Sequence, residues 1–133
     1  MPVVTALYAG LLGLMAIAIA FKAGRLRGQL NIPLGDGGNR DMLLAMRRHA
    51  NFAEWVPLAL VLIGLLEMSG VSRTAIHALG GGLFAARACH ALGLRADTMQ
   101  GTGRLVGAAG TALIVAISSV WLIYRFVGAQ ASG

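Results

Sequence analysis

The sequence predicts an all-α integral membrane protein: a single domain over residues 1–133 that forms a bundle of four transmembrane helices. Two observations lead to this fold class. Hydrophobic residues make up 57% of the chain and charged residues only 12%, whereas about a quarter of the residues in soluble domains are charged. The apolar residues also fall into stretches near the ~20 residues that cross a bilayer. The spans are expected at about residues 3–21, 41–67, 74–94 and 104–124.

The first span, from Val3 to Phe21, contains no charged residue and is long enough to cross a membrane. A cleavable signal peptide is the alternative interpretation. However, no basic residue precedes the apolar run, and the run is longer than the ~7–15 residues usual in a signal peptide. We therefore expect a retained helix whose apolar part ends at Lys22.

The second span follows a glycine-rich, turn-forming stretch at residues 34–39. Asp41 is expected to cap this helix. The helix begins polar and becomes apolar only from Trp55, so its first turns must lie at the edge of the bilayer or be shielded by other helices. Pro57, inside the apolar part, predicts a kink.

The third and fourth spans follow a short polar connection near residues 67–73 and a polar loop at residues 95–103. Arg87 and His90 interrupt the third span. The fourth has an uncharged interior and ends with Trp121 and Tyr124, aromatic residues that suit a membrane interface.

The net charge of +6 is compatible with a membrane protein that has basic cytoplasmic loops. No nucleic-acid partner is expected, because aromatic residues are only 6% and no stretch interleaves them with basic residues. Most of the basic residues fall in the first loop (residues 22–40), directly after it, and in the third loop. The positive-inside rule therefore places both loops in the cytoplasm and both termini outside.

Several pairs of small residues are spaced four apart, which lets membrane helices approach closely within or between subunits. These pairs are Ala6/Gly10, Ala9/Gly13, Gly103/Gly107 and Ala108/Ala112.

Six polar residues near the predicted cytoplasmic ends of the spans are the candidate site: Arg47, Asn51, Glu54, Arg87, His90 and Arg104. An ionisable residue at the centre of a membrane helix costs roughly 2.5–3.5 kcal/mol and is a functional candidate by default. The first three follow a spacing of i, i+4 and i+7 and so share one stripe of the second helix.

Two interpretations of this cluster remain open. One is a structural ion-pair network, for example between Glu54 and Arg87. The other is an anion-binding site, favoured slightly by the excess of arginine, whose planar guanidinium suits carboxylates. Arg48 and Arg95 are interpreted as residues that extend to the membrane interface, and Cys89 as a packing residue. No metal-ligand spacing occurs, so no metal is expected.

The polar residues lie in motifs that resemble the family of membrane-associated proteins in eicosanoid and glutathione metabolism (MAPEG), particularly its short bacterial members. Residues 47–54 match the family's Arg-x3-Asn-x2-Glu pattern on the second helix. Arg87 and His90 are similar to its Arg-x2-His on the third helix, and Arg104 resembles the arginine that opens the fourth.

The resemblance implies a homotrimer in the bacterial inner membrane, with glutathione as co-substrate between neighbouring subunits near the cytoplasmic surface. By this analogy glutathione would be bound by Arg47, Asn51, Glu54, Arg87 and His90. Arg104 would lie near the sulfur and favour the thiolate. The implied function is a glutathione-dependent transferase or peroxidase that acts on lipophilic electrophiles.

The sequence departs from the family at one place: several family enzymes carry a tyrosine shortly after the Arg-x2-His motif, but residues 91–94 are Ala-Leu-Gly-Leu. Whether the protein is an enzyme therefore stays open, and the alternative is a non-catalytic lipid- or partner-binding protein of the same fold. A small four-helix exporter is a less favoured alternative, because the deep parts of the spans are uncharged.

Overall fold

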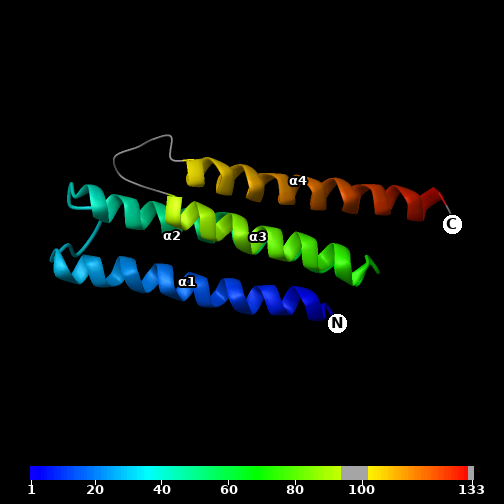
Figure 1. Ribbon diagram of the computed structural model, residues 1–133, viewed down its shortest axis with the longest axis horizontal. Coiled ribbons are helices and arrows are strands. Elements are labelled where there is room, and N and C mark those ends of the chain that lie inside the picture. Colours follow the sequence, from blue (N-terminus) through cyan, green and yellow to red (C-terminus); the bar gives the residue numbers. More distant parts are fainter. Residues whose placement is uncertain (94–101, 132–133) are drawn as a thin grey trace.

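The computed structural model describes residues 1–93 and 102–131, which form four helices and no strand. These are α1 (Val3–Gln29), α2 (Arg40–Met68), α3 (Arg73–Gly93) and α4 (Thr102–Ala131). The helices run alongside one another, with the start of α1 and the end of α4 at the same end of the bundle (Figure 1). The predicted all-α four-helix fold is confirmed.

Helices α2 and α3 are central to the packing because each contacts all three other helices, and the most extensive contact is between α3 and α4. Helices α1, α2 and α4 are each long and apolar enough to cross a membrane. Helix α3 has only 21 residues, and its two histidines and two arginines reduce its mean hydropathy. Its contacts with the other helices surround Arg87 and His90 with protein rather than lipid, whereas Arg73 and His77 are exposed.

The helices extend beyond the apolar spans that the sequence predicts. Helix α1 continues past Lys22 to Gln29, and α4 continues past Tyr124 to Ala131. Arginine, leucine and glutamine have high helix propensity, so a helix persists after its composition becomes polar. Hydropathy therefore marks the apolar part of each helix rather than its ends.

The start of α2 corrects the predicted cap. The Asn39 side-chain oxygen accepts a hydrogen bond from the Met42 backbone N–H at 3.0 Å, so Asn39, and not Asp41, is the N-cap. The preceding turn contains glycines with positive φ, which bring Asn39 to the helix start in an extended conformation. Asp41 lies in the first turn, where its charge favours the helix dipole. Pro57 lies inside α2, which continues to Met68.

Glu67 joins the end of α2 to the start of α1. One carboxylate oxygen accepts a hydrogen bond from the Val4 N–H at 2.8 Å, and the other accepts bonds from the Thr5 N–H and hydroxyl, each at 2.7 Å. The first N–H groups of a helix have no partner within the helix. Glu67 therefore satisfies two of them and places a negative charge at the positive end of α1.

The core lies between the helices, whereas α1 and α4 present long apolar faces outward. The largest buried apolar side chains of the core include Leu12, Phe52, Val56, Ile63, Leu66, Ile76 and Leu83. Exposed apolar residues follow α1 at Leu7, Leu11, Leu14, Ile17 and Phe21, and α4 at Leu105, Leu113, Ile117, Val120 and Ile123. Faces of this size and composition suit lipid or a neighbouring subunit.

The small-residue pairs behave in two ways. A Cβ atom added at Gly107 would lie 2.5 Å from the Ala86 carbonyl oxygen and from the His90 backbone nitrogen, so this glycine allows α4 to approach α3. In contrast, a Cβ atom at Gly10 or Gly13 would meet nothing within 4 Å. Close packing within the chain is therefore confirmed at Gly107, while these two α1 glycines face outward.

Candidate functional site

Arg87 is the most deeply buried of the predicted site residues, with only 1% of its surface exposed. Its Nη2 donates a hydrogen bond to the Asn51 side-chain oxygen at 2.8 Å, and its Nη1 donates to the Thr111 hydroxyl at 3.3 Å. The Thr111 hydroxyl in turn donates to the Gly107 carbonyl at 2.8 Å. Because a buried charge is costly unless it is hydrogen-bonded, these contacts hold the guanidinium between α2 and α4.

The partners of Arg87 rule out the proposed ion pair with Glu54. Both hydrogen-bonding partners are neutral side chains, and Glu54 is exposed. The guanidinium also lies over the Phe52 ring, 5.8 Å from its centroid, which is within the range of a cation–π contact. Within residues 1–93 and 102–131, no carboxylate neutralises Arg87.

His90 lies one turn after Arg87 and is 5% exposed. The Arg104 backbone approaches Gly93, three residues after His90, and Arg48 lines the same cavity as Ala91, the residue next to His90. Gly107 packs against the His90 backbone and so brings the start of α4 close to it. The bundle therefore brings cations from three helices to one end: Arg48 from α2, Arg87 from α3 and Arg104 from α4.

Arg87 and His90 each have a buried nitrogen atom without a hydrogen-bond partner among the described residues. These atoms are Nε of Arg87 and Nδ1 of His90. Buried polar atoms in proteins are normally hydrogen-bonded. These two nitrogens therefore keep hydrogen-bonding capacity that the described residues do not use.

The structure separates the three residues of the α2 stripe. Asn51 is half-buried and turns its side chain toward Arg87, whereas Arg47 and Glu54 are exposed on the surface of the single chain. Arg104 is also exposed, although its backbone approaches Gly93, three residues after His90. Asn51, Arg87 and His90 thus form a buried centre, with the other three candidates toward the surface.

Sequence reasoning missed two residues of this cluster, Thr111 and Arg48. Thr111 is 1% exposed and supplies an acceptor to Arg87; its sequence signal is a hydroxyl residue in an otherwise apolar stretch, four positions after Gly107. Arg48 was interpreted as extending to the membrane interface, but it is half-buried and lines the same cavity as Ala91, the residue next to His90. No pattern within one helix could reveal either contact, because each depends on how the helices pack.

Two other side chains of α3, Cys89 and His77, lie outside the cluster. Cys89 is exposed. The His77 ring is held at the far end of α3, where its Nδ1 lies 3.0 Å from the Tyr8 hydroxyl. The described residues contain no group of three potential metal ligands. Arg95 and most of the predicted third loop lie outside the described residues.

Comparison with known proteins agrees with the sequence motifs. A model of the MAPEG family matches residues 5–124. The chain is 39% identical over 90 residues to the inner membrane protein YecN of Escherichia coli strain K12, which covers 68% of this chain and 69% of that protein. YecN of the O6:H1 strain CFT073 gives the same values. All six candidate residues lie within the range that the family model matches.

Proposed function

This chain belongs to the MAPEG family and, like YecN, is an inner membrane protein; we propose that it is a glutathione-dependent transferase or peroxidase acting on lipophilic electrophiles. The observation that carries this proposal is the buried guanidinium of Arg87, which no described carboxylate neutralises. A site of this kind favours an anionic ligand, and glutathione has two carboxylates.

The chemistry of the site residues fits the groups of glutathione. Arginine guanidinium groups bind carboxylates in a planar, two-pronged geometry. In the proposed site Arg87 and Arg47 bind the carboxylates, Asn51 binds an amide, and the carboxylate of Glu54 binds the ammonium. The unpartnered Nδ1 of His90 adds one more polar atom to the site.

Arg104 is the proposed catalytic residue. A nearby cation favours the thiolate over the thiol, and the thiolate is the nucleophile. In the transferase reaction the thiol proton passes to solvent and the sulfur attacks an electrophilic carbon. A carbon–sulfur bond forms while the leaving group departs with its bonding electrons. The apolar outer faces of α1 and α4 let a lipophilic electrophile approach from the bilayer.

We also propose that the site is completed by a second subunit of a homotrimer. Arg47 and Glu54 are exposed on the single chain, which leaves them free to contact a ligand shared with a neighbour. The outward-facing glycines of α1 support close packing between chains. Native mass spectrometry of the detergent-solubilised protein tests this stoichiometry directly.

Conjugation of glutathione to a chlorodinitrobenzene-type electrophile tests the activity. The wild-type protein should turn over, and Arg104→Ala should lower kcat by about 100-fold or more, the scale expected when one electrostatic stabiliser of the reacting atom is removed. Arg73→Ala is the matched control, because this exposed arginine lies at the other end of α3. No wild-type turnover, or equal rates for wild type and Arg104→Ala, would contradict the proposal.

A non-catalytic binding protein is the second candidate, because residues 91–94 lack the tyrosine that several family enzymes carry. Calorimetry distinguishes the two. Glutathione binding without turnover on a broad panel of electrophiles favours this alternative, whereas robust turnover excludes it.

A further inference from the structure

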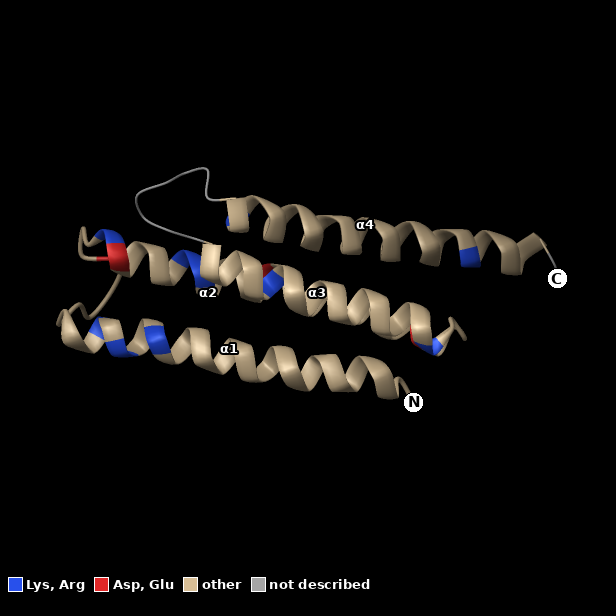
Figure 2. Cartoon of the chain, in the orientation of Figure 1, with Lys and Arg blue, Asp and Glu red and all other residues tan. Residues whose placement is uncertain are grey.

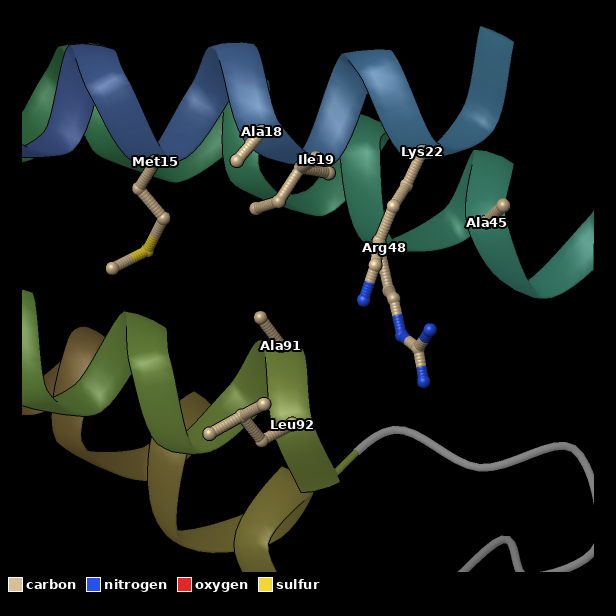
Figure 3. A pocket seen from close by; sticks show the side chains of 8 residues that line it. All are labelled: Met15, Ala18, Ile19, Lys22, Ala45, Arg48, Ala91 and Leu92. Atoms are coloured by element: carbon tan, nitrogen blue, oxygen red, sulfur yellow. The ribbon is translucent and has the colours of Figure 1, made fainter. Parts of the chain in front are cut away.

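A cavity of about 200 Å³ lies between α1, α2 and α3, near the end of the bundle that carries most of the basic residues (Figure 3). Helix α1 contributes Met15, Ile19 and Lys22, α2 contributes Arg48, and α3 contributes Leu92; three alanines complete the lining. Lys22 belongs to none of the motifs that define the candidate glutathione site.

One end of the cavity is cationic. The side chains of Lys22 on α1 and Arg48 on α2 extend toward the same end of it (Figure 3). None of the acidic residues that the structure describes lines this cavity. An ammonium and a guanidinium on the same wall form charge-assisted hydrogen bonds with a phosphate or a carboxylate.

The rest of the cavity is apolar. Met15, Ile19 and Lys22 follow one another along α1, so Met15 lies about 10 Å from Lys22 along the helix axis, at 1.5 Å per residue. The flexible methionine side chain can adapt to different chain shapes. On the opposite wall Leu92 is 79% exposed, so the cavity is open to the surroundings of the bundle.

We propose that this cavity binds an anionic amphiphile. The anionic group lies between Lys22 and Arg48, and the first part of the hydrocarbon chain lies along Ile19 and Met15. The cavity is smaller than the ~300–1,000 Å³ of typical drug-sized sites, so the remainder of the ligand extends past Leu92 into the bilayer. The chemistry is shared by anionic phospholipids and free fatty acids.

The distribution of charge agrees with this proposal. Figure 2 shows that Lys and Arg gather at the end of the bundle away from the chain termini, where the cavity lies. Basic residues at the cytoplasmic surface attract anionic lipids. This cavity thus combines the cation pair that recognises an anionic headgroup with an apolar wall that recognises the adjoining hydrocarbon chain.

Native mass spectrometry of the full chain tests the proposal. The protein is released from detergent micelles that contain equal amounts of dioctanoyl phosphatidylglycerol and dioctanoyl phosphatidylcholine. We expect phosphatidylglycerol adducts in excess in the wild type. Lys22→Gln should reduce this excess by about tenfold, the effect of losing one charge-assisted hydrogen bond. Arg25→Gln, an exposed cation on the same helix outside the cavity, should retain it.

A second variant tests the apolar wall. Ile19→Trp fills the cavity but keeps both cations, and it should reduce the excess of phosphatidylglycerol adducts. Thermal unfolding shows whether each variant is folded.

Octanoate is the third probe. Displacement of phosphatidylglycerol by octanoate assigns the site to free carboxylates as well, and failure to displace it assigns the site to membrane phospholipid. Equal adducts of the two lipids in the wild type, or an unchanged excess in folded Lys22→Gln and Ile19→Trp, would overturn the proposal.

Discussion

Arg87 shows how a single buried charge organises the site. Its two terminal nitrogens bind side chains from α2 and α4, so the guanidinium connects three helices with neutral partners. A carboxylate partner would neutralise the charge, whereas an amide and a hydroxyl stabilise it and leave it available to attract an anion. Asn51 is therefore a structural partner of Arg87 as well as a candidate ligand residue.

Removing the Asn51 amide should destabilise the bundle. In Asn51→Ala the buried Nη2 of Arg87 loses its acceptor, and an unsatisfied buried donor costs about 1–3 kcal/mol. Arg47→Ala, an exposed residue one turn earlier, should change the free energy of unfolding by less than about 0.5 kcal/mol. Denaturant unfolding in detergent measures both variants, and equal stabilities would contradict the structural role assigned to Asn51.

Glu67 offers a second test at the level of one side chain. In Glu67→Gln the negative charge is lost and one of the two accepting oxygens becomes an NH2 group, so the contacts with Val4 and Thr5 weaken. We expect a loss of about 1–3 kcal/mol and faster hydrogen exchange of these two amides. Glu54→Gln, which alters an exposed carboxylate of the same helix, should leave exchange at the start of α1 unchanged.

Of the two neutral side chains that bind Arg87, sequence reasoning singled out Asn51 as a candidate but missed Thr111. Arg87 and His90 stand out because charges are rare in membrane helices, and the motif spacing then led to Asn51. In the sequence, Glu67 lies where the predicted second span meets the polar connection to the third. Its actual role, at the start of a different helix, depends on tertiary packing that no local pattern records.

At the scale of elements, the contact between α3 and α4 determines the geometry of the site. Gly107 allows the backbones to approach, which brings Thr111 to Arg87 and the start of α4 to His90. Sequence spacing predicted this close contact correctly. The same spacing on α1 gave a different result, because spacing identifies a helix face that can pack closely but not the surface that covers it.

Gly107→Ala should separate α4 from α3. The new methyl group would meet backbone atoms of Ala86 and His90, which cannot rotate away, so α4 must shift. We expect a loss of about 1–3 kcal/mol, the range for overpacking a tight contact, together with weaker glutathione binding measured by calorimetry.

Gly128→Ala is the control on the same helix, because a Cβ atom at Gly128 meets nothing within 4 Å. This substitution should leave stability unchanged or raise it slightly, since alanine favours helix more than glycine by about 1 kcal/mol. Equal stability of the two variants would show that the α3–α4 contact tolerates a methyl group.

At the scale of the molecule, charge and apolar surface together indicate how the bundle lies in a membrane. Basic residues gather at the end that includes the turn between α1 and α2 (Figure 2). Glu67 near the end of α2, Arg73 at the start of α3, and Arg125, which contacts Ser69, lie at the other end. There Arg125 donates a hydrogen bond to the Ser69 carbonyl, which ties α4 to the end of α2. The positive-inside rule then predicts a cytoplasmic α1–α2 turn and an external α2–α3 connection.

Single-cysteine labelling tests this orientation. In a Cys89→Ala background, Leu34→Cys places a thiol in the α1–α2 turn and Ser72→Cys places one in the α2–α3 connection, both at exposed positions. A membrane-impermeant maleimide added to intact spheroplasts should label the Ser72→Cys protein and not the Leu34→Cys protein, and lysis should make both reactive. Because the sites of Lys22, Arg48 and Arg87 lie toward the same end as Leu34, the reverse pattern would place both proposed anion sites toward the external face, away from cytoplasmic glutathione.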